Sequence, residues 1–249
     1  MAPPLTATAF LNALRAEGIT VVEVGSWRTH TRTAESRPWG PVHGVLIHHT
    51  VTRGTQNSVS ICRDGYSGLP GPLCHGVIGK DGVVYLVGYG RTNHAGGGDP
   101  NVLKQVTAEN YGTAPTKPTK GNLDGTDGNR HFYGFECENM GDGKDPWPSK
   151  QVEAIVRAAT AVCRAHGWSA KSAIGHLEWS DDKSDPRGFT MPSIRDRVAE
   201  RLKHSANWNP STPTPPPVST IETRVAALEK LVAAQEKRIV ALEKKAAPK

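Results

Sequence analysis

The chain has 249 residues, enough for one well-buried domain of about 200 residues and a smaller appendage. With 37% hydrophobic and 22% charged residues and no run of 18 apolar residues, it has the composition of a soluble protein without insertion into a membrane. Its net charge of +6 favours a polyanionic partner, such as nucleic acid, an anionic lipid or a charged cell-wall polymer.

The first 18 residues predict a short amphipathic helix rather than a secretory signal. Phe10, Leu11 and Leu14 recur at helical spacing, and Gly18 follows as a C-terminal stop. A signal peptide would need a basic segment followed by a long apolar run, and neither is present. We therefore expect synthesis in a cytoplasm without a signal peptide.

Several short segments have the pattern of strands. Residues 19–24 and 42–48 are rich in apolar, β-branched side chains, and residues 77–87 predict a hairpin around an Asp-Gly turn. Residues 132–138 (FYGFECE) predict a further strand. The segment 88–130 is rich in Gly, Asn, Thr and Pro without clear periodicity, which indicates a functional surface loop.

Two later segments predict helices. Residues 151–166 place their apolar side chains on one helical face and end at Gly167, and residues 193–203 repeat apolar residues four apart. The first of these helices should cover the predicted sheet. Mixed strands and helices predict a layered α/β domain over residues 1–206.

A Pro-rich segment, 207–219, follows this domain and predicts a stiff, extended linker. Beyond it, residues 220–246 predict a coiled-coil helix that joins copies of the chain into a homo-oligomer. A single helix of this length would not be stable in water without burying its apolar stripe. The stripe alternates by four and three residues and consists of Ile221, Val225, Leu228, Val232, Gln235, Ile239 and Leu242.

The four cysteines contain no C-x-x-C pair, so neither a thiolate zinc knuckle nor a redox motif is indicated. A disulfide between Cys62 and Cys74 would close a short loop. A cytoplasmic origin favours reduced thiols, and the sequence leaves the state of this pair open.

Three residues have the chemistry of a catalytic metal site. In such sites zinc takes three imidazole or carboxylate ligands and keeps a fourth position open for water. His48 ends a predicted strand, while His176 and Asp185 lie in a polar stretch, GHLEWSDDKSDPRG, with few apolar residues to place it in a core. A lone histidine is usually solvated or hydrogen-bonded, so the prediction depends on the joint pattern.

Four motifs in this order resemble the type 2 N-acetylmuramoyl-L-alanine amidases, the superfamily that includes peptidoglycan recognition proteins and many phage endolysins. The motifs are IHHT at 47–50, NHAG at 93–96, GFECEN at 134–139 and GHLEWSDDKSDP at 175–186. The resemblance covers residues 20–203, and the ordered combination is specific although each motif alone is weak. It implies a mixed central sheet flanked by helices.

The resemblance implies one Zn²⁺ ion in the catalytic domain, with His48, His176 and Asp185 as its ligands. Lys183 matches a family lysine that stabilises the developing oxyanion. His49 is then expected to support the metal site or to face the substrate.

Glu136 matches the glutamate that relatives use beside the zinc water, and we predict it to be the general base. Glu138 alternates to the same face of a strand, so geometry alone does not exclude it. Some relatives place a tyrosine near the metal, and Tyr85 and Tyr66 remain open in this respect.

Other motif residues have expected roles as well. His94 matches a family His-Ala-Gly loop that lines the groove, and we predict that it binds substrate. His75 is expected to be structural, and Trp179 is more often a core residue than a sugar platform in such a place.

The resemblance implies a zinc-dependent amidase that hydrolyses the lactyl-amide bond between N-acetylmuramic acid and L-alanine in bacterial peptidoglycan. A phage endolysin fits best, acting on the wall after the membrane is permeabilised. The alternatives are a recognition module that binds peptidoglycan without cleaving it and a cytoplasmic amidase that recycles anhydromuropeptides. No basic patch interleaved with aromatic residues is evident, so we do not expect nucleic-acid binding.

Overall fold

A mixed six-stranded sheet organises the fold, which we describe for residues 1–209 of a computed structural model. Neighbouring strands are parallel except β6 and β5, which form an antiparallel hairpin. The order across the sheet is β1 (Val21–Glu23), β6 (Val84–Leu86), β5 (Gly76–Ile78), β9 (Tyr133–Cys137), β2 (Val45–His49) and β10 (Ala173–Gly175).

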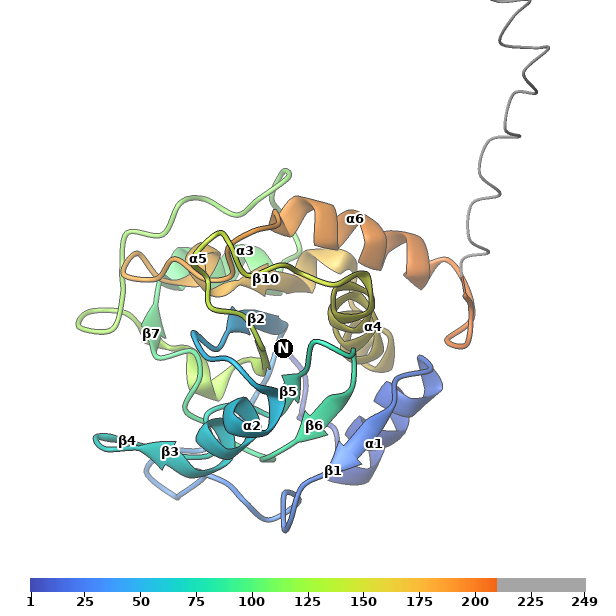
Figure 1. Ribbon diagram of the computed structural model, residues 1–249. Helices are drawn as coiled ribbons and strands as arrows, with labels where there is room; N and C mark the ends of the chain where they lie inside the picture. The colour runs from blue at the N-terminus through green and yellow to red at the C-terminus, as the bar shows by residue number, and fades with distance from the viewer. Residues whose placement is uncertain (210–249) are drawn as a thin grey trace, which may run out of the picture. The chain divides into compact units, whose positions relative to one another are not determined.

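Helices cover both faces of this sheet (Figure 1). The larger helices pack together on one face and bury the main core, and these are α1 (Ala7–Ala16), α4 (Ser149–His166) and α6 (Met191–Leu202). Smaller clusters of buried side chains lie beneath the shorter helices, α2 (Thr55–Asp64), α3 (Pro100–Thr107) and α5 (His176–Trp179). The other elements of residues 1–209 are short, namely β3 (Gly65–Tyr66), β4 (Leu69–Pro70), β7 (Gly97–Gly98), β8 (Thr126–Asp127), η1 (Gly128–Arg130) and η2 (Ala170–Ser172).

Alternation along β2 decides which side chains enter the site. Val45 and Ile47 join the core beneath α1, α4 and α6, whereas Leu46 packs in the cluster beneath α3 and α5. Because successive side chains of a strand point to opposite faces, His48 lies on the same face as Leu46. The register pairs His48 with Glu136 on β9, which brings these two residues side by side.

The mixed α/β architecture predicted from the sequence is confirmed. The sequence did not reveal α2, whose ten residues are mostly polar, or α3, which lies inside the predicted loop 88–130. A start signal for α3 was present, because the side chain of Asp99 caps the helix and Pro100 follows at its first position. Cys62 and Cys74 are both buried, free thiols.

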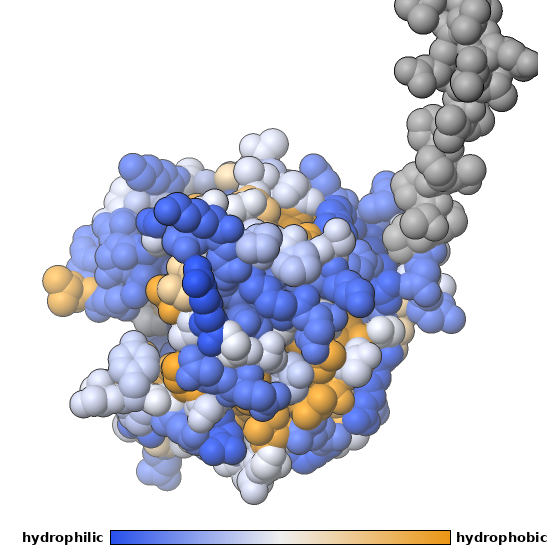
Figure 2. All heavy atoms as spheres, in the orientation of Figure 1, coloured by the Kyte–Doolittle hydropathy of each residue, from blue (hydrophilic) through white to orange (hydrophobic). Residues whose placement is uncertain are grey.

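Hydrophilic residues cover most of the face shown in Figure 2, with exposed hydrophobic residues in small groups. Among residues 1–209, no helix has the length and apolar character needed to cross a bilayer. The predicted coiled coil at 220–246 and nearly all of the predicted linker lie outside the described residues. These two domain assignments remain predictions.

The end of α4 carries a stack of three rings. The Trp168 indole stacks with two imidazoles, with ring centroids 4.0 Å from His166 and 4.4 Å from His43. His166 also pairs with the Tyr133 hydroxyl at 3.0 Å, and His43 with the Ser172 hydroxyl at 3.0 Å. Burial lowers the pKa of both histidines from 6.5 to about 4.

We predict that this stack makes the domain sensitive to acid. Both imidazoles stay neutral in the folded chain until about pH 4 but are protonated near pH 6.5 when it unfolds, so stability falls as the pH drops through this window. Replacing both residues (His43→Asn with His166→Asn) should reduce the acid-induced loss of Tm by several degrees, at about 2–4 °C for each kcal/mol of stability that the two protonations remove. Thermal denaturation from pH 7 to pH 4 measures it, and identical slopes for both proteins would contradict the prediction.

Candidate active site

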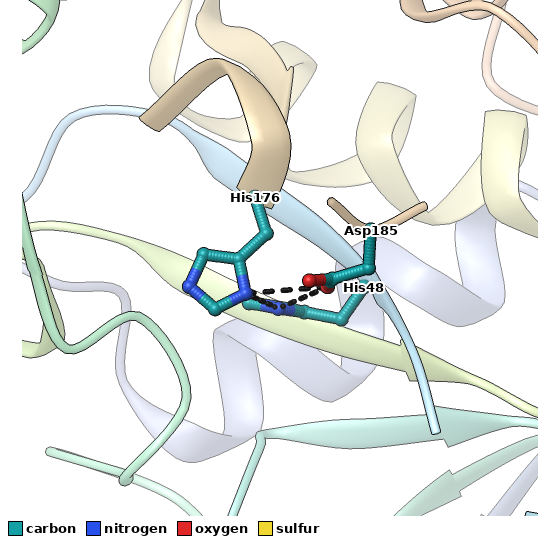
Figure 3. A group of neighbouring side chains, drawn as sticks. All are labelled: His48, His176 and Asp185. Atoms are coloured by element: carbon teal, nitrogen blue, oxygen red, sulfur yellow. Dashed lines mark hydrogen bonds and ion pairs between the residues drawn. The ribbon is translucent and has the colours of Figure 1, made fainter. Parts of the chain in front are cut away.

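Three side chains from two distant parts of the sequence meet at the carboxyl end of β2 (Figure 3). The Nδ1 atoms of His48 and His176 lie 2.9 Å apart, and each lies 3.2 Å from Oδ2 of Asp185. The two histidines are almost fully buried, and the Asp185 side chain is 16% exposed. The three residues predicted as metal ligands therefore form one compact cluster.

The parallel pairing of β10 with β2 explains how His176 reaches His48. Gly175, the last residue of β10, pairs with Ile47, so the residues that follow this pair, His176 and His48, lie at the same edge of the sheet. His176 is the first residue of α5, and the backbone N–H of Leu177 donates to the carbonyl of Asp185. That bond closes the loop that carries the carboxylate back to the two imidazoles.

A buried ion pair fixes the start of α5. The Glu178 carboxylate accepts a hydrogen bond from the Gly175 backbone N–H at 3.1 Å and binds the Arg195 guanidinium at 2.8 and 2.9 Å. Arg195 also donates to the carbonyls of Ala173 and Thr113. Since both terminal nitrogens of the guanidinium find two acceptors each, α5 is anchored to α6 and to β10 at once.

Hydrogen bonds on the far side of each ring assign the protons of the two histidines. Nε2 of His176 lies 3.2 Å from the Ala95 carbonyl, which can only accept, so Nε2 carries the proton. Nε2 of His94 likewise donates to the Phe132 carbonyl at 3.2 Å. Nδ1 of His94 is therefore an acceptor for Nε2 of His48, at 3.1 Å. Both His48 and His176 consequently turn an unprotonated Nδ1 toward Asp185.

This arrangement fits a metal ion. Two imidazole lone pairs and a carboxylate oxygen converge within 3.2 Å without a proton between them, which is unfavourable unless a cation lies among them. Burial lowers the pKa of His48 to about 4, so its imidazole is neutral at neutral pH, as metal binding requires. Two nitrogens and one oxygen from the protein are a donor set typical of catalytic zinc.

Glu136 lies beside this cluster with one carboxylate oxygen free. Its Oε1 lies 4.0 Å from Nδ1 of His48, and its buried Oε2 has no hydrogen-bond partner among residues 1–209. Burial raises the pKa of the Glu136 carboxyl well above its usual value, the charge of Asp185 adds to this, and that of Lys183 opposes it. A carboxylate so placed is available to exchange a proton.

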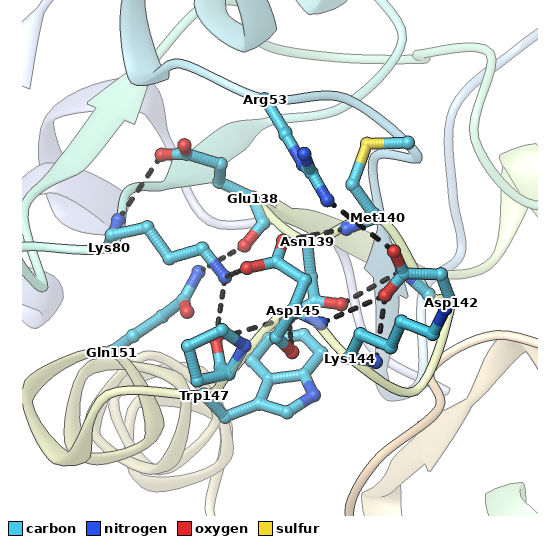
Figure 4. A network of polar contacts seen from close by, with 12 residues as sticks. Arg53, Lys80, Glu138, Asn139, Met140, Asp142, Lys144, Asp145, Trp147 and Gln151 are labelled. Atoms are coloured by element: carbon cyan, nitrogen blue, oxygen red, sulfur yellow. Dashed lines mark hydrogen bonds and ion pairs between the residues drawn. The ribbon is translucent and has the colours of Figure 1, made fainter.

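Glu138, which the sequence could not distinguish from Glu136, has a different environment (Figure 4). Its carboxylate accepts hydrogen bonds from the Gly54 N–H at 2.9 Å, the Thr55 hydroxyl at 2.6 Å and the Lys80 N–H at 3.3 Å. Gly54 and Thr55 form the start of α2, so Glu138 caps this helix. Its oxygens are committed to the scaffold.

Lys183 and His49 flank the cluster. Lys183 is partly exposed, and its charge acts on both His48 and Glu136, lowering the pKa of each. Nδ1 of His49 accepts a hydrogen bond from the Arg187 N–H at 3.2 Å, which ties β2 to the loop that follows Asp185. The ring packs so closely on Gly141 that a Cβ there would lie 2.3 Å from Nε2.

His94 is buried, and both of its ring nitrogens are bonded within the protein. The substrate-binding role predicted for it stays a prediction, but the geometry gives it a second role in orienting His48. Sequence reasoning did not find Asn129, whose side-chain oxygen holds the loop that contains His94. The Gly-Asn-Arg sequence around it has the composition of an ordinary turn, so no signal marked it.

The remaining motif residues have structural environments. His75 accepts from the Gly134 N–H and donates to the Gly90 carbonyl, both at 2.9 Å, which agrees with the structural role expected for it. Trp179 is fully buried, as expected for a core residue. Tyr85 lies on β6, separated from β2 by β5 and β9, and Tyr66 lies exposed on β3.

We predict that Glu138 matters for stability and not for chemistry. Glu138→Ala should lower the free energy of unfolding by about 2 kcal/mol, because two backbone N–H groups and a hydroxyl lose their acceptor. Urea denaturation measures this. Arg53→Ala, which removes only an exposed ion pair with Asp142, is the matched control and should cost less than about 0.5 kcal/mol. Loss of activity in a Glu138→Ala protein of unchanged stability would overturn this assignment.

Comparisons with known proteins identify the family of the chain. Residues 38–188 match the family model Amidase_2, N-acetylmuramoyl-L-alanine amidase. A comparison with curated proteins finds no match.

Solved structures with a similar fold include three amidases or hydrolases of 14–15% identity. The endolysin amidase LysCS from Clostridium intestinale has a TM-score of 0.46, and the match covers 72% of this chain and 95% of that one. Staphylococcus aureus hydrolase AmiA, solved with its ligand, has a TM-score of 0.46 and coverages of 81% and 93%. Escherichia coli amidase AmiD, solved with an anhydromuropeptide substrate, has a TM-score of 0.38 and coverages of 67% and 61%.

The family match spans more than half of the chain and includes all four predicted motifs. The resemblance inferred from the sequence is thus confirmed. The chain belongs to the N-acetylmuramoyl-L-alanine amidase family.

Proposed function

We propose that the chain is a zinc-dependent amidase that hydrolyses the bond between the lactyl group of N-acetylmuramic acid and L-alanine in bacterial peptidoglycan. The convergence of three unprotonated ligand atoms at His48, His176 and Asp185 carries this proposal. Membership of the amidase family supplies the reaction class.

In this proposal Glu136 moves the proton. A zinc ion in the cluster would supply a Lewis acid for the scissile carbonyl and a water that ionises near neutral pH. Glu136 accepts the proton of the attacking water on its carboxylate, whose Oε1 lies 4.0 Å from Nδ1 of His48, and delivers it to the nitrogen of the leaving L-alanine. Its raised pKa supports this role, because a carboxyl group that readily holds a proton can also return it.

Lys183 is proposed to stabilise negative charge on the carbonyl oxygen as the tetrahedral intermediate forms. Its charge already reaches both His48 and Glu136, which supports a place near the reacting atoms. Groups that act on developing charge in this way contribute about 10²–10³-fold to the rate in comparable sites.

Two observations favour an enzyme over a recognition module that binds without cleaving. All three ligand positions are filled, and the carboxylate beside them has a free oxygen. A cytoplasmic amidase that recycles soluble anhydromuropeptides is the second alternative. The net charge of +6 favours the polymer instead, since an extended anionic polymer gains more from a basic protein than a short fragment does.

We also propose a lytic role in the manner of an endolysin, made in the host cytoplasm and reaching the wall after the membrane is permeabilised. The predicted coiled coil at 220–246, which lies outside the described residues, would join several catalytic domains. Joined domains would raise avidity for a polymeric wall without a separate binding module.

Removal and return of the metal tests the central proposal. Dialysis against a chelator should abolish the release of soluble muropeptides from purified peptidoglycan, and one equivalent of Zn²⁺ should restore it. Mass spectrometry should find new L-alanine amino termini. Binding without cleavage would instead identify a recognition module, and new ends at sugar bonds would refute the amidase assignment. A preference for soluble anhydromuropeptides over polymer would favour recycling.

Replacing the proposed base separates chemistry from metal binding. Glu136→Gln should lower kcat by about 10²–10⁴-fold, because the amide cannot accept the proton, while zinc content and Tm stay near those of the parent protein. Glu138→Gln is the matched control and should retain activity per folded molecule. Full activity of Glu136→Gln would exclude it as the base.

A further inference from the structure

A single dipeptide contacts both of the histidines in the proposed metal site. The side chain of His94 accepts a hydrogen bond from Nε2 of His48 at 3.1 Å, and the main-chain carbonyl of Ala95 accepts one from Nε2 of His176 at 3.2 Å. These two bonds decide which nitrogen of each ring carries the proton. The position of residues 94–95 therefore controls both ligands together.

The side chain of Asn129 binds the backbone of this dipeptide. Its side-chain Oδ1 accepts hydrogen bonds from three consecutive backbone N–H groups, those of His94 at 2.8 Å, Ala95 at 2.7 Å and Gly96 at 3.3 Å. Asn129 is 8% exposed and lies in η1, just before β9. Three amide donors around one oxygen fix the local backbone far more firmly than a single bond does.

The surroundings leave the loop little room to adopt another arrangement. The Trp179 indole N–H donates to the same Ala95 carbonyl at 3.1 Å. A Cβ on Gly98 would lie 2.1 Å from this ring, and a Cβ on Gly128 would lie 2.7 Å from it. The backbone at Gly98 and at Gly128 thus packs directly against the indole. The Ala95 carbonyl accepts hydrogen bonds from both Trp179 and His176.

We propose that Asn129 is a positioning residue for the metal site: through His94 and Ala95 it keeps both imidazoles protonated at Nε2, with Nδ1 turned toward the ion. This inference rests on the proposed zinc site. Without the acceptor at position 129, two buried N–H groups and a partly buried one lose their partner, and the loop must shift to satisfy them. Each imidazole then loses the fixed partner that selects its tautomer and ring orientation.

Two substitutions at one position test the hydrogen-bond acceptor itself. Asn129→Leu has a similar shape but no acceptor, and it should raise the dissociation constant for Zn²⁺ by about 10–100-fold, the range for loss of such supporting groups. Asn129→Asp retains an oxygen for the same N–H groups and should bind Zn²⁺ much closer to the wild-type protein. Chelator competition measures the dissociation constants.

The ring nitrogens give a readout that a merely structural residue would not affect. In the zinc-free, full-length protein labelled with ¹⁵N-histidine, NMR should show His48 and His176 as single Nε2-protonated tautomers. Asn129→Leu should show mixed tautomers for both residues, and Asn129→Asp should restore the wild-type pattern. Asn122→Leu is the matched control, because it removes only the bond to the Gly97 N–H in the same loop, and it should change neither readout.

If Asn129→Leu fails to fold, two substitutions of His94 test the same connection. His94→Gln can still accept from His48 and donate to the Phe132 carbonyl, so it should bind Zn²⁺ more tightly than His94→Leu. Wild-type affinity and tautomers in Asn129→Leu, or equal affinities of the two His94 variants, would overturn the inference. A wild-type protein that binds no Zn²⁺ would instead refute the proposed function, while the tautomer comparison would still test the role of Asn129.

Discussion

Repulsion among three acceptor atoms is the constraint on which this site depends. Nδ1 of His48, Nδ1 of His176 and Oδ2 of Asp185 lie within 3.2 Å of one another, and none of them carries a proton in the assigned hydrogen-bond network. Without a cation among the atoms such a group is unfavourable, so it persists only if the rings cannot turn away. The sheet brings these residues close together, and hydrogen bonds from the surrounding loops orient the imidazole rings.

Strand pairing in the sheet sets the distances from His48 to His176 and to Glu136. Parallel pairing with β10 and β9 places His176 and Glu136 beside the end of β2, and alternation turns His48 and Glu136 to the same face. The buried pair of Glu178 with Arg195 then fixes α5 behind His176. Two nearby carboxylates have separate roles: Glu136 on β9 keeps an oxygen without a hydrogen-bond partner, whereas Glu138, just after this strand, caps α2.

The sequence predicts much of this arrangement. The apolar run at 42–48, the polar stretch around His176 and the long amphipathic helix at 151–166 each have a strong local pattern, and the structure brings the three expected ligands together. Strand alternation could not separate Glu136 from Glu138, because their difference comes from Gly54, Thr55 and Lys80, which are distant in sequence. Asn129 was missed for the same reason, since its partners lie more than 30 residues away.

The groups that hold the two imidazoles differ in whether a single amino-acid substitution can remove them. The carbonyls of Ala95 and Phe132 belong to the main chain, so no change of side chain at these two positions deletes the acceptor itself. His94 and Asn129 contribute through side chains, and a single codon change can remove either one. Among the residues that orient the two imidazoles, substitutions at His94 and Asn129 should therefore be the most damaging. Position 95 can accept other side chains that fit the packing.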